Sequence, residues 1–166
     1  MKKTPKIVTL SLSQQIALPT TSTEKLKTLL PASTVRGWVK KALVGYMDAS
    51  QVQLTLRWVG QAESRALNKT HRGQGVEKDY ATNVLTFAYG IDENKALAAD
   101  IVLCWPVLLA EAKVQKKLLR HHAAHLIIHG VLHALGYDHE NDADAEQMEA
   151  LETELLAQLR IADPYF

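Results

Sequence analysis

The sequence contains a single cysteine, Cys104, and this scarcity excludes a fold held together by disulfide bonds within the chain. No apolar run approaches the roughly 18 residues that a membrane-spanning helix needs. Neither sign of charge is in large excess, because the formal net charge is +1, so any nucleic-acid surface must be a local patch. Internal repeats, low-complexity tracts and interdomain linkers are also missing. We therefore expect one domain, residues 1–166, in the cytoplasm.

Four segments read as β-strands. Residues 6–13 and 51–59 alternate apolar and polar side chains, which indicates strands with one buried face. Residues 84–89 and 98–103 are short apolar runs bounded by polar or turn residues. The polar pair that follows the first segment, Gln14 and Gln15, argues against a signal peptide. The lone cysteine falls in an apolar strand, where we expect a buried structural thiol.

Helical spacing and boundary residues predict five or six helices. Thr21 with Glu24 has the spacing of a capping box. The predicted helices run from Thr21 to just before Pro31, from Ser33 or Thr34 to about Met47, from Gln61 to Lys69, from Pro106 to about Lys116, through the histidine-rich segment that follows, and from Asn141 or Asp142 onward. The segment from Thr70 to Thr82 is predicted to be a loop. Strands and helices that do not alternate strictly point to an α+β fold.

The segment HGVLHALGYDH, residues 129–139, contains three regularly spaced histidines. His129 and His133 are four residues apart, so on a helix their rings project from the same face. Gly136 provides a residue that readily adopts the left-handed conformation ending a helix, which lets His139 turn back toward the other two. Three imidazoles from such an arrangement suit a catalytic zinc site with an open fourth position. Chance pairs of histidines are common on helices, but three at this spacing predict a metal-binding helix.

The histidine spacing also matches the long zincin pattern H-E-x-x-H-x-x-G-x-x-H of metalloproteases. Those proteases carry a glutamate after the first histidine, and this chain has Gly130 there. Loss of a general base costs about 10²–10⁴-fold in rate. We therefore expect a zincin-like metal helix without peptidase activity.

The same histidine segment resembles the signature of the YbeY family of endoribonucleases. The resemblance extends to the segment from Leu67 to Gly73, to Asn83–Phe87 and to Asp100–Cys104, and covers about residues 50–160. It implies a small mixed β-sheet packed with helices, with the metal helix lying across the sheet. It also implies a single-strand-specific, metal-dependent endoribonuclease that acts in ribosomal RNA maturation, including processing of the 3′ end of 16S RNA, and in ribosome quality control.

The resemblance assigns roles to individual residues. His129, His133 and His139 are the expected ligands of one zinc ion per chain, and Arg72 is expected to stabilise the scissile phosphate, which a guanidinium grips with two parallel hydrogen bonds. The expected partners are single-stranded RNA, ribosomal RNA and the ribosome or its small subunit, with neither DNA nor a membrane. The segment from Gln74 to Lys78 looks like an insertion relative to the family.

Several nearby residues have more than one interpretation. His125 continues the histidine stripe and is either a fourth ligand or, more simply, a packing residue or a partner of a ligand. Asp138 either holds a ligand imidazole or forms the turn before the last helix. His71 is expected to be a stacking or loop residue. A basic cluster is either an ordinary solvated surface or an RNA contact, and comprises Lys113, Lys116, Lys117, Arg120 and His122.

Two alternative functions remain open at this point. A metal-dependent hydrolase of amides or small molecules fits the zincin-like spacing, although Gly130 argues against it. A ribosome assembly factor with a purely structural zinc would need a closed shell of four ligands, completed by His125 or Asp138.

Overall fold

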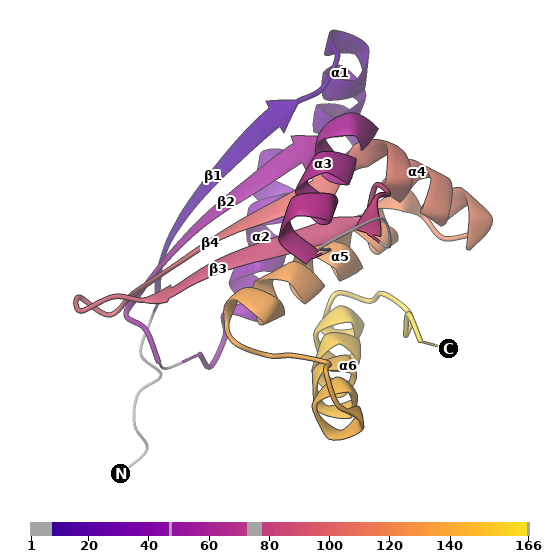
Figure 1. Cartoon of the computed structure of the whole chain (residues 1–166). Coiled ribbons are helices and arrows are strands. Elements are labelled where there is room, and N and C mark those ends of the chain that lie inside the picture. Colours follow the sequence, from indigo (N-terminus) through magenta and orange to yellow (C-terminus); the bar gives the residue numbers. More distant parts are fainter. Residues whose placement is uncertain (1–7, 47, 73–77, 166) are drawn as a thin grey trace.

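The computed structural model describes residues 8–46, 48–72 and 78–165. In this part of the chain, four strands form one sheet in the order β1-β2-β4-β3 (Figure 1). The elements in chain order are β1 (Thr9–Ala17), α1 (Thr20–Leu29), α2 (Ala32–Ala42), β2 (Gln51–Val59), α3 (Gln61–Arg72), β3 (Val84–Ile91), β4 (Ala96–Cys104), α4 (Trp105–Val114), α5 (Leu119–Ala134) and α6 (Asp142–Gln158). The predicted α+β fold with a small mixed sheet is confirmed, because β1, β2 and β4 are parallel whereas β3 runs antiparallel to β4.

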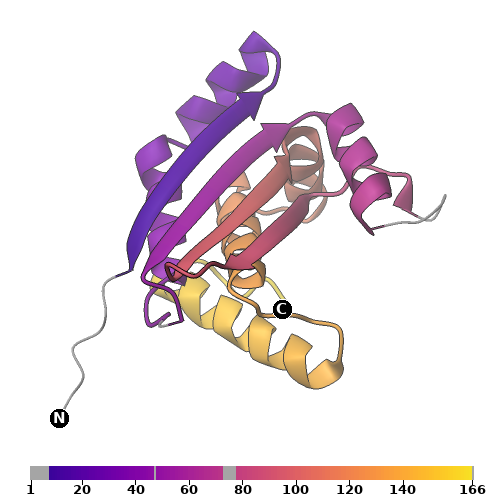
Figure 2. The same ribbon diagram turned by 60° about the vertical axis from the view of Figure 1, so that its left-hand side comes forward.

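Helices pack on both faces of the sheet, but unequally (Figure 2). The main core lies between the sheet and the layer that contains α2 and α5, and it includes Leu54, Leu56 and Ile101. A smaller cluster on the opposite face joins α3 to the edge of the sheet through Leu67, with Val102 of β4 beneath it. Alternate residues of β4 therefore face different cores, as expected for strand side chains with a two-residue period.

The helix that carries the histidines crosses the sheet in close contact with its edge. The carbonyl oxygen of Gly130 in α5 accepts a hydrogen bond from Oγ1 of Thr86 in β3, at 3.1 Å. A Cβ atom at Gly130 would lie only 2.8 Å from Cγ2 of Ile101 and 3.4 Å from Cγ2 of Val84. The glycine thus permits a close approach of helix to sheet. It leaves no room for the glutamate that a zincin protease carries at this position.

Strand boundaries differ modestly from the prediction. β1 continues through Gln14 and Gln15 to Ala17, because its backbone pairs in parallel with the whole of β2. Residues 6 and 7 of the predicted strand lie outside the described residues. β3 and β4 are each longer than expected and extend to a turn at residues 92–95, in which Lys95 has a positive φ angle of 61°. Gly90, where a turn was expected to begin, lies within β3 at a register irregularity and has a φ of 79°.

Helix starts were predicted to within one or two residues, but α2 ends at Ala42 rather than near residue 47 and α3 continues beyond Lys69 to Arg72. The residues expected to cap the first two helices were predicted less well. α1 and α2 begin directly after Pro19 and Pro31, and neither helix has a side-chain cap. The capping roles expected for Thr21 and for Ser33 or Thr34 are therefore wrong. Each proline occupies the N-cap position with an extended ψ of 154° or 144°, and the helix begins at the next residue. In contrast, Asn141 caps α6 as predicted, accepting a hydrogen bond from the backbone amide of Asp144 at 2.9 Å.

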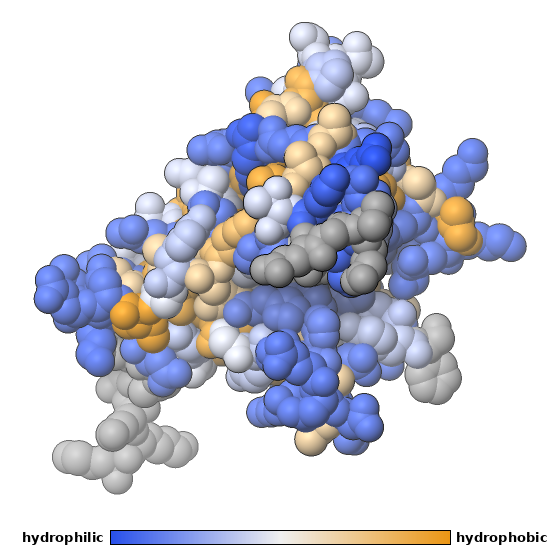
Figure 3. Space-filling view, viewed as in Figure 1, coloured by the Kyte–Doolittle hydropathy of each residue, from blue (hydrophilic) through white to orange (hydrophobic). Residues whose placement is uncertain are grey.

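The boundary expected within Gln115 to Lys117 is confirmed, since α4 ends at Val114 and α5 begins at Leu119. The final helix packs its apolar side against α5 (Figure 1) and turns a hydrophilic surface outward (Figure 3). Within the described ranges, no helix combines the length and apolar character needed to cross a membrane.

Candidate metal centre

Three imidazoles meet at the C-terminal end of α5, as the sequence predicted. His129, His133 and His139 each offer a ring nitrogen, and these three atoms lie within 4.8 Å of one another. Nε2 of His133 is 3.1 Å from Nε2 of His129. The first two rings are partly buried and the third is exposed, so the group has one side open to solvent.

The turn after α5 brings the third histidine to the other two. Gly136 has a φ of 102°, a left-handed conformation that glycine adopts without strain. Its amide donates to the carbonyl of His133 at 3.0 Å, and the amide of Tyr137 donates to the carbonyl of Leu132 at 3.1 Å. These two bonds form a Schellman motif, which satisfies the last carbonyls of the helix and reverses the chain. His139 follows two residues later.

The donor set and its spacing fit a zinc ion. Two nitrogens that each lie about 2.0–2.1 Å from a tetrahedral zinc are about 3.3 Å apart, close to the separation of the two Nε2 atoms. Burial, together with the neighbouring His129 and His139, lowers the pKa of His133 to about 4. The His133 imidazole is therefore neutral at physiological pH and has a lone pair available for a metal.

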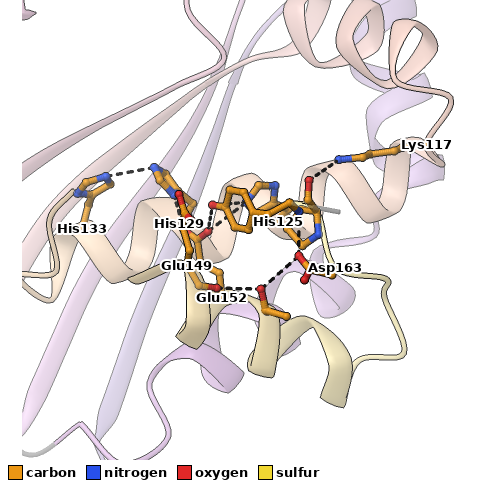
Figure 4. Close-up of polar contacts among 10 residues, drawn as sticks. Lys117, His125, His129, His133, Glu149, Glu152 and Asp163 are labelled. Carbon is orange, nitrogen blue, oxygen red and sulfur yellow. Dashed lines mark hydrogen bonds and ion pairs between the residues drawn. The ribbon is translucent and has the colours of Figure 1, made fainter. Parts of the chain in front are cut away.

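A buried carboxylate from α6 completes the surroundings of His129. Glu152 is fully buried, and its Oε1 accepts a hydrogen bond from Nδ1 of His129 (Figure 4). Burial by itself favours the neutral acid, but hydrogen bonds from His125 and His129 lower the pKa of Glu152 to about 2. The carboxylate is therefore ionised. Local sequence patterns did not predict this role for Glu152.

A sequence feature nevertheless marks Glu152. It lies four residues after Met148 and three before Leu155, within the buried apolar stripe of α6. A carboxylate in an apolar stripe needs partners inside the protein. Histidines on a neighbouring helix are suitable ones.

His125 and Asp138, the two proposed fourth ligands, make other contacts. Nε2 of His125 lies 3.2 Å from Oε2 of Glu152 and 3.3 Å from the hydroxyl of Tyr165. Oδ1 of Asp138 accepts a hydrogen bond from the backbone amide of His139, at 2.7 Å, which is a turn-forming contact. His125 also belongs, with His129 and Glu152, to a second group whose ligand atoms lie within 4.8 Å, but hydrogen bonds already link these side chains.

Not every residue of the predicted basic cluster lies at the protein surface. His122 is 3% exposed, and its Nε2 lies 2.7 Å from Oε2 of Glu111 in α4. Its inclusion among surface cations was therefore wrong, because the side chain turns inward between two helices. Lys113, Lys116 and Arg120 are exposed, whereas Lys117 is half-buried.

The predicted loop from Thr70 to Thr82 starts later than expected, because α3 continues to Arg72. The His71 ring packs against the ring of Phe87 in β3, with centroids 4.2 Å apart and planes tilted by 43°, so His71 is an aromatic contact at the end of a helix and not a loop residue. This contact places the end of α3 beside the strand that touches α5. The side chain of Arg72 lies outside what the structure describes, as do residues 74–77 of the expected insertion.

Comparisons with known proteins show which family the chain belongs to. A family model described as Endoribonuclease YbeY matches residues 20–160. The chain belongs to the YbeY family. Its members include a protein of Cupriavidus necator named Endoribonuclease YbeY, 56% identical over 137 residues, which cover 82% of this chain and 65% of that protein. A protein of the same name from Paraburkholderia phymatum is 52% identical over 84% of this chain and 85% of its own length.

The chain spans just under two thirds of the length of some YbeY relatives, with 65% for Cupriavidus necator and 62% for Cupriavidus metallidurans. A solution structure of a Thermotoga maritima protein matches with a TM-score of 0.51 and 23% identity, and covers 90% of this chain and 92% of that one. This likeness shows a shared fold. The resemblance of the histidine segment to the YbeY family is thus confirmed over most of the chain.

Proposed function

We propose that this protein is a zinc-dependent endoribonuclease that cleaves single-stranded RNA, with one zinc ion per chain held by His129, His133 and His139. The observation that carries the proposal is the group of three imidazoles with one open side, in a chain of the YbeY family. We further propose that it acts in the cytoplasm on ribosomal RNA, in 16S 3′-end maturation and ribosome quality control, with the ribosome or its small subunit as partner.

Zinc at such a site supplies Lewis-acid polarisation of a phosphoryl oxygen and acidifies water. The protein's part is to hold and orient the reacting groups. His129 and His133 project from one rigid helix, and the turn at Gly136 holds His139 beside them. The open side of the group leaves space for a phosphodiester to approach.

Arg72 is proposed to bind the scissile phosphate. It is the last residue of α3, next to His71, whose ring packs against Phe87 of β3. β3 in turn contacts α5 through Thr86 and Gly130. The end of α3 therefore lies beside the edge strand that borders the metal helix. A permanently charged guanidinium stabilises the extra negative charge that develops on phosphorus oxygens during cleavage.

The two alternative functions are less well supported. A peptidase needs a general base that the tight packing at Gly130 does not accommodate. A structural zinc needs a fourth protein ligand, but His125 and Asp138 make hydrogen bonds elsewhere.

The test is cleavage of a single-stranded RNA by the purified protein before metal removal, after it and after zinc is restored. We expect cleavage to disappear with the metal and return with zinc, and His133→Ala to lose both bound zinc and activity. Cleavage that survives complete metal removal would contradict the proposal, as would no cleavage by zinc-loaded protein with or without small ribosomal subunits.

Replacement of the phosphate-binding residue is expected to separate chemistry from metal binding. Arg72→Ala should slow cleavage by about 10²–10³-fold, the usual cost of removing one transition-state donor. Zinc content, measured on the same sample, should stay at one per chain. Arg72→Lys should restore part of the rate, since it keeps the charge but not the bidentate geometry. Wild-type cleavage by Arg72→Ala would remove this residue from the mechanism.

A further inference from the structure

Glu152 accepts hydrogen bonds from three side chains, two histidines of α5 and a tyrosine that follows α6 (Figure 4). Its Oε1 accepts from Nδ1 of His129, and its Oε2 accepts from the hydroxyl of Tyr165 and faces Nε2 of His125 at 3.2 Å. The carboxylate is fully buried. A buried ionised group is costly unless it is fully hydrogen-bonded, so these three donors are what permit Glu152 to occupy the α5–α6 interface.

The contact with His129 determines which nitrogen of that ring is free. A neutral imidazole carries its proton on one nitrogen only. Because Nδ1 donates to Glu152, the lone pair is left on Nε2, the atom that lies 3.1 Å from Nε2 of His133. The carboxylate also prevents rotation of the ring. Carboxylates in this position increase the basicity of a ligand histidine and fix its orientation.

Tyr165 connects the C-terminal segment to the same carboxylate. Its ring packs edge-on against His125, with centroids 5.5 Å apart, and its amide donates to Oδ1 of Asp163 at 2.8 Å. Asp163 also lies within 3.4 Å of Oγ1 of Thr153 in α6. The C-terminal segment thus contacts α6 at two points. Because an ionised carboxylate can only accept hydrogen bonds, the Tyr165 hydroxyl is the donor to Glu152.

We propose that Glu152 is the positioning residue for His129, and that Tyr165 of the C-terminal segment holds Glu152 in place, so that this segment tunes the metal affinity of a site it does not touch. The inference rests on the proposed metal role of His129. The inference gives a reason for the buried charge of Glu152 on α6, since an apolar side chain would suffice for packing at that position.

The test compares Glu152→Gln and Tyr165→Phe with a matched control, Glu154→Gln, which removes an exposed carboxylate two residues along the same helix. The first measurement is the dissociation constant of zinc, by competition with a coloured chelator. We expect Glu152→Gln to weaken binding by about 10–100-fold, the usual effect of losing such a partner. Tyr165→Phe should weaken it by a smaller factor, and Glu154→Gln should leave it unchanged.

A second measurement distinguishes positioning from a general loss of structure. Nitrogen-15 NMR of the metal-free protein reports which nitrogen of His129 carries the proton. Wild type and Glu154→Gln should have it on Nδ1, whereas Glu152→Gln should show a substantial share on Nε2. The visible spectrum of the cobalt-substituted protein should shift in Glu152→Gln and stay unchanged in the control.

The outcomes are decisive in both directions. Unchanged zinc affinity and an unchanged His129 tautomer in Glu152→Gln would overturn the inference, even if the wild type cleaves RNA. If Glu152→Gln does not fold, Tyr165→Phe decides, since it leaves the carboxylate in place; wild-type zinc affinity and cobalt spectrum in that variant would overturn the inference. A wild type that binds zinc through the three histidines but cleaves no RNA would contradict the proposed function alone.

Discussion

His122 and His129 of α5 each contact a glutamate of a neighbouring helix, and these two pairs are built in opposite ways. In the pair with α4, the His122 side chain is 4% exposed and Glu111 is 28% exposed. In the pair with α6, the His129 side chain is 21% exposed and Glu152 is fully buried. One pair thus buries the imidazole and the other buries the carboxylate, although both lie on the same helix.

The difference shows what turns such a pair into part of a metal site. Nδ1 of His122 is enclosed and has no hydrogen-bond partner among the described residues, so the ring has no nitrogen available to a ligand. The second nitrogen of His129 faces His133 at the open side of the cluster. A histidine–carboxylate contact is therefore structural when the imidazole is enclosed, and suited to metal binding when its other nitrogen reaches a shared space.

The largest expected difference is in zinc affinity, when His129 and His122 are replaced separately. His129→Ala should weaken zinc binding by more than about 100-fold, because loss of a ligand exceeds loss of a ligand's partner. His122→Gln should keep the zinc affinity of the wild type, since its ring faces α4. Zinc titration of the two variants side by side checks the comparison. Comparable losses in both would show that the two pairs do not differ as described.

The next effect concerns stability rather than metal. Glu111→Gln removes the charged partner of His122 and also alters the contacts of Glu111 with Nδ2 of Asn83, at 3.1 and 3.2 Å. We expect the free energy of unfolding to fall by about 1–3 kcal/mol, the usual cost of leaving a buried polar group poorly paired. Urea denaturation of metal-free protein measures this. Loss of zinc affinity without loss of stability would contradict a structural role for the pair.

The smallest effect is a pH dependence. Burial lowers the pKa of His122 below its usual 6.5, despite the opposing influence of Glu111, and Lys117 and His125 act in the same direction as burial. The unfolded chain therefore takes up a proton at higher pH than the folded protein, so the stability contribution is complete above about 6.5 and declines as the pH falls toward the folded pKa. Comparing His122→Gln with wild type between pH 7 and 5 should show a flatter decline in the variant. A parallel decline in both would assign the pH dependence to other groups.

Sequence patterns over a few neighbouring residues correctly predicted the features that depend only on those residues. The strand over Gln51–Val59, the cap at Asn141 and the glycine turn after α5 all follow from side chains within a few positions of one another. Some missed features involve partners far along the chain: β1 extends through two glutamines because β2 pairs with its whole length. The missed cap at Thr21 is a local error, because α1 already begins at Thr20, directly after Pro19.

The sequence by itself determined the family, the α+β class and the grouping of three histidines, because the helical spacing and the glycine after it act over a single short segment. Only the tertiary structure decided what surrounds that group. The packing of α5 on Ile101 excludes a side chain at Gly130, and the docking of α6 buries Glu152 against His129. The packing at Gly130 and the burial of Glu152 both depend on contacts between segments distant in sequence. The spacing of neighbouring residues does not specify which helix packs against which.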